Sequence, residues 1–162
     1  MSLGIAFKGA EGIVLAADSR VTLNNIIDIP GAAPGTPQKA LIPATFDSAR
    51  KLLNVASQTH VGAVTFGTAS IGQAAPRTVA SFLPEFEDEL AKIKKGRLSV
   101  EDFAKKLGEF FTAQWIAAKM PNPPASGNEM TFLVGGYDEG APHGRVFSVT
   151  VPTCSTRISS PT

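Results

Sequence analysis

The chain has few of the residues that build metal centres and disulfides. Its 162 residues include one cysteine, Cys154, and two histidines, His60 and His143. A single cysteine can form neither an internal disulfide nor a zinc site built on cysteines. The two histidines lie far apart without the spacing of metal ligands, so we expect each to be a turn or surface residue. The sequence therefore predicts no metal site built on cysteine or histidine.

Excess charge and long apolar runs are also missing. Fifteen Lys and Arg against fourteen Asp and Glu leave a net charge of +1, which argues against a nucleic-acid partner. Residues 12–17, the longest apolar run near the start, fall far short of the ~20 residues that span a bilayer, and Lys8 and Glu11 interrupt any signal-peptide core. We therefore expect a cytoplasmic protein that does not bind membranes. A hydrophobic content of 43% predicts a single domain over residues 1–162.

The N-terminal part of the chain divides into two unlike segments. Residues 4–8 and 13–17 are short apolar runs joined by a Gly-bounded connection, which predicts a β-hairpin. Because nearly every position is apolar, we expect both faces of this hairpin to be buried. Residues 19–50 contain four prolines and show no sustained period, so they are interpreted as a long Pro/Gly-containing loop or insertion.

The middle of the chain returns to regular structure. Residues 51–56 and 61–66 have strand character and are separated by a short polar turn. The chain then switches to an apolar pattern of three- and four-residue spacings, which predicts a helix over residues 70–95. Pro76 and Pro84 are expected to kink or divide it.

A second helix and a second hairpin follow. Ser99 has the character of an N-cap, and the helix after it is expected to continue to about Lys119 with its aromatic residues in the core. Residues 130–136 and 145–152 predict a hairpin, and residues 154–162 read as a frayed or artificial terminus. The order of elements predicts an α/β (α+β) fold in which antiparallel sheet is layered with helices.

The first two residues suggest a chemistry. Initiator methionine is generally removed when a small residue follows, and removal of Met1 would leave Ser2 with a free α-amine. Such an amine has a reference pKa of ~7.7–8.0 and can act as a general base for the hydroxyl of its own residue. Many proteins begin with these two residues for no catalytic reason.

The next residues carry a family resemblance. Residues 4–22, which end in Ala-Ala-Asp-Ser-Arg-Val-Thr, closely resemble the opening of proteasome β-type subunits, members of the N-terminal nucleophile hydrolases. The family spacing, counted back from Asp18, places the nucleophile on Ser2, where serine replaces the usual threonine. The resemblance implies a four-layer α-β-β-α sandwich and a threonine-type endopeptidase that needs no cofactor. It also implies peptide or unfolded-protein substrates and assembly into homo-oligomeric rings or with other proteasome-type subunits.

The resemblance extends to the other residues of a catalytic site. Residues 50–55 look like the family's third strand, so Lys51 would be the lysine beside the nucleophile and Asp18 its carboxylate partner. A cation close to Ser2 would favour the alkoxide and keep the amine neutral. Residues 61–70 resemble the strand-to-helix junction of the family, where the glycine N–H helps to form an oxyanion hole, which assigns that role to Gly67.

The same comparison assigns a substrate side. Val21 and Ala69 would line the substrate channel near the first specificity pocket, and Arg20 would support the adjoining loop. Extended peptides would pair with the backbone near Val21 and Gly67. Residues 134–138 resemble the family's Gly-Trp/Tyr-Asp turn.

Two departures keep other functions open. The segment between Arg20 and Lys51 is longer than in typical members, and the family's later helices and strands, with a supporting aspartate and serine, have no counterpart in this sequence. One alternative is a non-catalytic or degenerate ring subunit with a role in assembly. Another is an N-terminal nucleophile amidase that acts on small amides. Taken singly, Asp18, Lys51 and Gly67 also have ordinary structural explanations as a turn cap, a strand-edge residue and a turn glycine.

Overall fold

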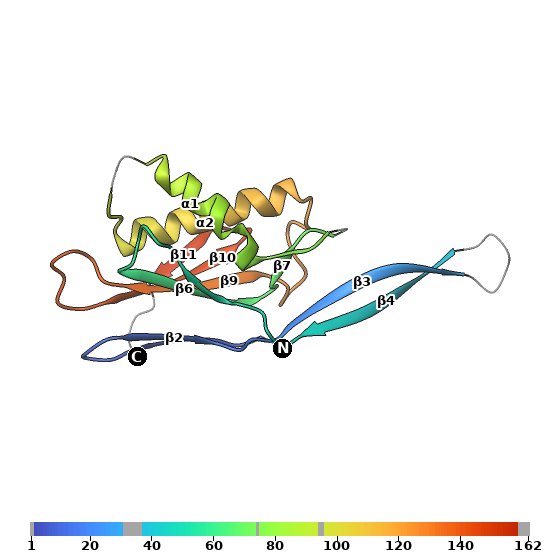
Figure 1. Ribbon diagram of the computed structural model, residues 1–162, viewed down its shortest axis with the longest axis horizontal. Helices are drawn as coiled ribbons and strands as arrows, with labels where there is room; N and C mark the ends of the chain where they lie inside the picture. The colour runs from blue at the N-terminus through green and yellow to red at the C-terminus, as the bar shows by residue number, and fades with distance from the viewer. Residues whose placement is uncertain (1, 31–36, 74, 94–95, 159–162) are drawn as a thin grey trace.

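The chain folds as layers of helix and antiparallel sheet. In the computed structural model, which describes residues 2–30, 37–73, 75–93 and 96–158, helices α1 (Leu83–Ala91) and α2 (Val100–Ala117) cover one face of a five-stranded sheet (Figure 1). A two-stranded hairpin lies against the opposite face. The fold is mixed α/β with antiparallel sheets, as the order of elements predicts.

The central sheet has the strand order β11-β10-β9-β6-β5. Its strands are β5 (Leu52–Asn54), β6 (Val61–Gly67), β9 (Met130–Gly136), β10 (Arg145–Val151) and β11 (Ser155–Ile158). All neighbours are antiparallel. The predicted hairpin of residues 130–136 and 145–152 is therefore confirmed, and the two strands expected over residues 51–56 and 61–66 also pair.

The last strand corrects one prediction. The sequence of residues 154–162 predicts a frayed or artificial terminus, but β11 pairs with β10 from Phe147↔Ile158 to Thr150↔Ser155. Cys154, with a φ of 50°, lies in the turn that reverses the chain after β10. The sequence does not indicate this strand, because its Ser and Thr residues give no alternation of apolar and polar positions. Such a strand still pairs with β10, because the pairing is made by backbone hydrogen bonds. Residues 159–162 lie outside the described part of the chain.

Helix α2 supplies the main apolar contact with the sheet. Phe103, Leu107, Phe111 and Trp115 recur every four residues, which places them on one helix face, and all are buried. The Phe111 ring lies 4.8 Å from the ring of Phe132 on β9. The predicted helix start is confirmed, since the Asp102 N–H donates to Ser99 Oγ at 3.0 Å. No helix among the described residues is both long enough and apolar enough to span a bilayer.

The helix expected over residues 70–95 begins later than predicted. The chain first forms two short strands, β7 (Ser70–Ile71) and β8 (Arg77–Thr78), and a 3₁₀ turn, η1 (Val79–Phe82). Gly72, with a φ of 111°, turns the chain out of β7. Pro84 occupies the first turn of α1, where a missing N–H breaks no helical hydrogen bond, so this proline starts the helix and does not kink it.

The N-terminal hairpin is buried on one face, so the prediction of two buried faces is wrong. Strands β1 (Gly4–Lys8) and β2 (Ile13–Ala17) pair as expected, but their side chains alternate between the sheet and the surface. The inner residues Ile13 and Leu15 contact glycines of the central sheet, Gly135 among them. Four apolar side chains point outward and are exposed: Leu3, Ile5, Phe7 and Val14. The described residues thus form three layers, and the fourth layer of the predicted sandwich is not among them.

Residues 19–50 are mostly a hairpin arm, not a long loop. Strands β3 (Val21–Pro30) and β4 (Pro37–Phe46) pair in register from Val21↔Phe46 to Pro30↔Pro37 and extend away from the body (Figure 1). Strand β3 is rich in β-branched residues, which favour extended backbone. Each strand of a two-stranded arm keeps a free edge, so Pro43 is tolerated there. The prolines therefore do not prevent strand pairing, and the prediction of a long loop, which rests on them, is wrong for the described residues. Residues 31–36 lie outside the described part of the chain.

Candidate active site

Ser2, Asp18 and Lys51 meet at one end of the N-terminal hairpin. The register Gly4↔Ala17 brings the residues just before β1 beside the residues just after β2. A backbone hydrogen bond of 3.2 Å from the Asp18 N–H to the Leu3 carbonyl oxygen continues this pairing. Residues sixteen positions apart in sequence therefore become neighbours, with Ser2 Oγ 3.5 Å from Asp18 Oδ1.

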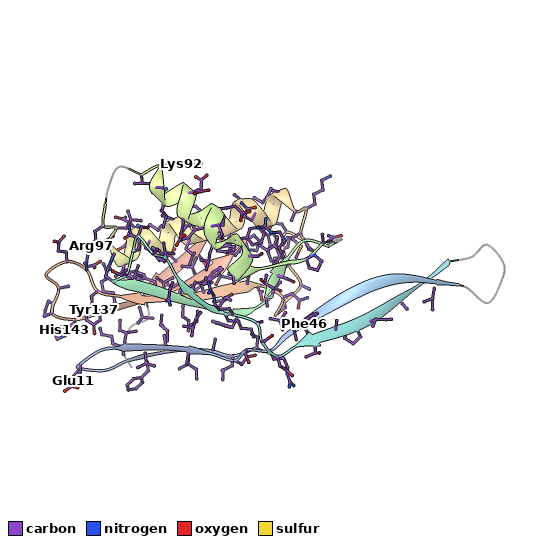
Figure 2. The ribbon with its side chains drawn as sticks, viewed as in Figure 1. Glu11, Phe46, Lys92, Arg97, Tyr137 and His143 are labelled. Carbon is purple, nitrogen blue, oxygen red and sulfur yellow. The ribbon has the colours of Figure 1, made fainter. Side chains whose placement is uncertain are left out.

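Lys51 reaches this pair from the central sheet. It lies directly before β5, and its carbonyl oxygen accepts a hydrogen bond of 3.1 Å from the Thr65 N–H of β6. Its ammonium donates to Ser2 Oγ at 2.8 Å and to Asp18 Oδ2 at 2.8 Å. Only 2% of the lysine side chain is exposed, against 30% for Asp18. The interaction predicted from the resemblance is thus formed by a lysine shielded from solvent. Phe46 marks the root of the arm, where β3 and β4 leave the body (Figure 2).

Asp18 is held in its ionised form. Burial acts to raise the pKa of this carboxyl, but hydrogen bonds from the Leu3 N–H, the Lys51 ammonium and the Arg20 N–H outweigh burial and lower the pKa to about 2. The Leu3 and Arg20 N–H groups lie 2.7 Å and 3.0 Å from the carboxylate oxygens. Asp18 is therefore a fixed negative charge that keeps the Lys51 ammonium directed toward Ser2.

This arrangement assigns different chemical capacities to the three groups. Lys51 donates to both partners, so in this geometry it can stabilise negative charge on Ser2 Oγ. Asp18 is already engaged by three donors besides the Ser2 hydroxyl. The cluster can thus favour a serine alkoxide, provided that another group takes the proton.

Gly67 lies at the end of β6 and faces the same cavity as Ser2. Its φ is 82°, and a Cβ at this position would clash with the Glu129 carbonyl oxygen, so the backbone here requires glycine. The neighbouring Thr68 N–H donates to that same oxygen at 3.0 Å. Gly67 and Ser2 thus line the same cavity, and the oxyanion role of the Gly67 N–H stays a prediction.

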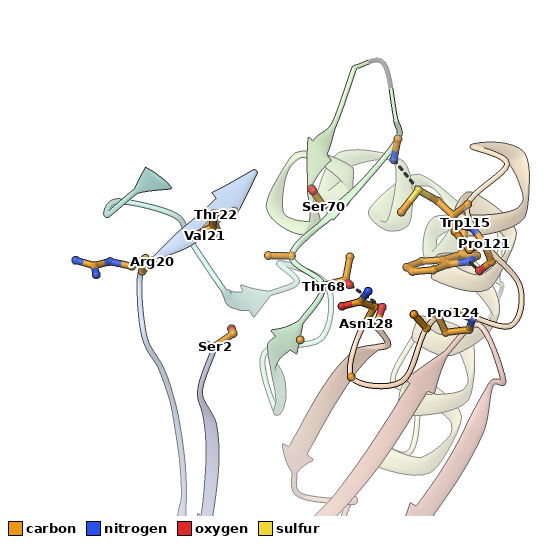
Figure 3. Close-up of a pocket in the computed structure, with 16 residues that line it drawn as sticks. Ser2, Arg20, Val21, Thr22, Thr68, Ser70, Trp115, Pro121, Pro124 and Asn128 are labelled. Atoms are coloured by element: carbon orange, nitrogen blue, oxygen red, sulfur yellow. Dashed lines mark hydrogen bonds between the residues drawn. The ribbon is translucent and has the colours of Figure 1, made fainter. Parts of the chain in front are cut away.

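The cavity itself has a volume of about 520 Å³ and begins at Ser2. Val21 and Ala69 line it, as expected for the substrate channel, and Arg20 lies at its edge (Figure 3). Arg20 is anchored from outside, since its Nε donates to Asp47 Oδ1 at 2.6 Å. The predicted residues that line this cavity are therefore Ser2, Gly67, Arg20, Val21 and Ala69. Asp18 and Lys51 are connected to it through their hydrogen bonds with Ser2 Oγ.

Several residues of this cavity were not predicted. The far wall comes from the end of α2 and the loop that follows it, and includes Trp115, Met120, Pro121, Pro124 and Asn128. The sequence indicates only that Trp115 is a core residue and that residues 120–128 form a loop. Four prolines and glycines within that loop are a signal of a fixed backbone, but no pattern connects them to Ser2.

Other polar residues have structural roles away from this cavity. The Asp138 carboxylate accepts a hydrogen bond of 2.7 Å from the Val100 N–H at the start of α2, and this bond lowers its pKa. His60 lies in the turn before β6, as predicted, and its Nε2 is 2.9 Å from the Leu98 carbonyl oxygen. Within the part of the chain that the structure describes, no group of three His, Cys, Asp or Glu residues could hold a metal ion.

Comparisons with known proteins add no family. No protein-family model matches the chain, and no curated protein matches its sequence. The resemblance to proteasome β-type subunits therefore rests on the residues of this sequence, and the site on its own geometry.

Proposed function

We propose that the chain is a proteasome-like peptidase that hydrolyses peptide bonds with Ser2 as its nucleophile, after removal of Met1. The observation that carries the proposal is the buried Lys51 ammonium, which lies 2.8 Å from both Ser2 Oγ and Asp18 Oδ2. An exposed lysine in a chance ion pair would not be directed at a serine hydroxyl. The proposal includes the four-layer sandwich, whose fourth layer would cover the outer face of the β1–β2 hairpin.

The first step forms an ester and releases an amine. Ser2 Oγ attacks the carbonyl carbon of the scissile bond and transfers its proton to the free α-amine of the same residue, directly or through a water. Lys51 stabilises the developing charge on Oγ. The Gly67 N–H donates to the carbonyl oxygen as it becomes an oxyanion. The C–N bond then breaks, and the leaving amine takes the proton from the α-ammonium.

The second step returns the enzyme to its starting state. Water gives a proton to the α-amine and attacks the ester carbonyl, and the oxyanion forms again at the same donor. The C–O bond to Ser2 breaks, Oγ regains a proton, and the new carboxylic acid leaves. Asp18 changes no bond and acts by orienting Lys51.

A second candidate function is a non-catalytic subunit that serves assembly. It is favoured by the four apolar side chains on the outer face of the β1–β2 hairpin, which are 47–65% exposed. The third reading, an amidase for small amides, uses the same chemistry at Ser2 and differs only in substrate size. The cavity of about 520 Å³ is larger than a small amide requires, so we favour a peptide.

The test is the intact mass of the purified protein before and after incubation with a peptidyl epoxyketone. This reagent joins to an N-terminal nucleophile through both the hydroxyl and the amine, so one adduct requires both groups. We expect loss of the Met1 mass and one stoichiometric adduct. Ser2→Ala should form none, whereas Ser57→Ala, which removes an exposed turn serine, should react as the parent protein does.

Different results separate the candidates. Retained Met1, or a free Ser2 that never reacts, would contradict the hydrolase proposal and leave the assembly role. Cleavage of small amides without any cleavage of peptides would support the amidase.

A further inference from the structure

The arm formed by β3 and β4 has two uncovered faces in the described part of the chain. Its strands are ten residues long and pair with each other, and no third described strand joins them. Beyond its root, the arm extends away from the body (Figure 1). A two-stranded hairpin alone is at best marginally stable in water, because nothing packs on its faces. A surface that covers one face would therefore stabilise the arm.

The two faces of the arm differ in polarity. Side chains alternate between the faces of a strand, and the register fixes which residues of β3 and β4 share a face. On one face, the residues whose side chains the structure describes are all apolar: Val21, Ile29, Ala40, Ile42, Ala44 and Phe46. On the other face they are Thr22, Pro43 and Thr45. We call the first of these the apolar face of the arm.

The apolar face is open to solvent beyond the root. Val21 is buried at the root, but Phe46, which pairs with it, is 53% exposed. Ile42, further along β4, is 47% exposed. Exposed apolar side chains that lie together on one face mark a surface for interaction with another molecule.

The apolar face also lacks charge, which makes it complementary to itself. The charged residues within 21–30 and 37–46 are Asp28 and Lys39. The register pairs these two positions with each other, and both alternate with the positions of the apolar face. A two-fold contact brings the same patch of two subunits together, so like charges would repel one another there. An uncharged apolar face avoids this repulsion.

From these observations we infer that the apolar face of the arm is an interface with a second copy of this chain, in which two arms pack face to face. At the free edge of β4, Pro43 opposes the addition of a further strand, which favours contact through the face. The inference goes beyond the proposed function and does not depend on it. The family resemblance offers no counterpart for this contact, because the segment between Arg20 and Lys51 is longer than in typical members.

The size of the apolar face sets the expected strength of the contact. Ten residues at ~3.3 Å per residue give a length of about 33 Å, and two strands ~4.8 Å apart give a width of about 10 Å. Each arm thus contributes about 330 Å², which is less than the ~800 Å² per partner of a standard stable interface. We therefore expect a reversible dimer whose population rises with protein concentration.

Cysteine cross-linking tests the contact directly. Ile42 lies near the middle of the ten paired positions, so a two-fold axis through the middle of the arm brings it close to its own copy. In a Cys154→Ala background, Ile42→Cys should give a covalent dimer with a short bismaleimide, because packed sheets lie ~10 Å apart. Pro43→Cys is the matched control on the other face and should give at least tenfold less dimer. Equal yields, or no dimer from Ile42→Cys at any concentration, would overturn the inference.

Sedimentation velocity over a range of protein concentrations tests the same contact without a reagent. Ile42→Lys places a charge on the apolar face and should weaken association by about tenfold or more, because the charge would lose its hydration in the contact. Thr45→Lys adds the same charge to the other face and should leave association unchanged. Both positions are exposed, so both variants should keep the Tm of the parent protein. Association that persists unchanged in Ile42→Lys would overturn the inference.

A different occupant of the apolar face would give a different result. If Ile42→Lys lowers kcat/KM for a peptide and leaves association unchanged, the face binds substrate and the inference is wrong. The epoxyketone assay bears only on Ser2, so the proposed function and this inference can each fail alone.

Discussion

Removal of the Lys51 ammonium is the perturbation that bears most directly on the site. Lys51→Met keeps a side chain of similar length but leaves the Asp18 carboxylate and Ser2 Oγ without their shared donor. Loss of one partner from a fully buried ion pair costs about 3–5 kcal/mol. Asp18 is 30% exposed and retains the Leu3 and Arg20 N–H groups, so we expect a smaller loss of about 2 kcal/mol in the free energy of unfolding.

The reverse change leaves a different group unpaired. Asp18→Asn removes the carboxylate from a lysine whose side chain is 2% exposed, and should destabilise the protein by about 3 kcal/mol. The double variant loses both charges and should cost about the same as Asp18→Asn alone, instead of the sum. The expected coupling is therefore about 2 kcal/mol.

Urea unfolding of the four proteins at pH 7 measures this coupling. Lys8→Met, at an exposed lysine, is the matched control and should change stability by less than about 0.5 kcal/mol. If the two single effects add to within about 0.3 kcal/mol in the double variant, Asp18 and Lys51 do not interact as described. In the epoxyketone assay, Lys51→Met should slow adduct formation by about 100-fold or more, because a donor to the reacting oxygen is lost.

Three further predictions concern stability. Because the pKa of Asp18 is lowered in the folded state, its carboxylate stabilises the fold fully above pH 3.8, the ordinary pKa, and this stabilisation is lost as the pH falls toward 2. Urea unfolding between pH 2 and 6 should therefore show a smaller loss of stability in acid for Asp18→Asn than for the parent protein. Gly67→Ala should lower the free energy of unfolding by about 2 kcal/mol or more, because its Cβ would clash with the Glu129 carbonyl oxygen. Gly127→Ala is the control, since Gly127 has the same φ of 82° but open space around it, and it should cost clearly less. Equal losses for the two variants would refute the clash. Ser99→Ala removes the N-cap of α2 and should cost about 1 kcal/mol by thermal unfolding, whereas an unchanged Tm would refute the role of this cap.

Local patterns predict the elements whose signals are complete within a short window. The four-residue recurrence of apolar residues in α2 and its N-cap at Ser99 lie next to each other in sequence, so the helix could be placed almost to the residue. Strand β11 and the arm could not be placed in this way. Their pairing is satisfied by backbone hydrogen bonds, and prolines and polar residues at free edges obscure the alternation that identifies a strand.

The contacts of the site differ in the same way, because some follow from local pairing and others depend on how distant elements pack. The contact between Ser2 and Asp18 follows from the hairpin register alone, and a sequence that predicts the hairpin also predicts this contact. The approach of Lys51 depends on the packing of the hairpin onto the central sheet, for which the sequence offers only the family resemblance. No local signal joins the loop after α2 to the cavity, because that contact depends on how far α2 extends across the sheet.

The root of the arm and the wall of the cavity share residues, and this affects how residues 19–50 are interpreted. Val21 is the first residue of β3, pairs with Phe46 at the root of the arm, and also lines the cavity next to Ser2. The Arg20–Asp47 ion pair and the hydrogen bond of 2.9 Å from the Ala49 N–H to the Ser19 carbonyl oxygen close the same root. The two ends of the segment are therefore held together within the wall of the site, so that the arm can extend without displacing Asp18 or Lys51. An insertion at this point is compatible with the proposed chemistry because its root, and not its length, determines where the flanking residues lie.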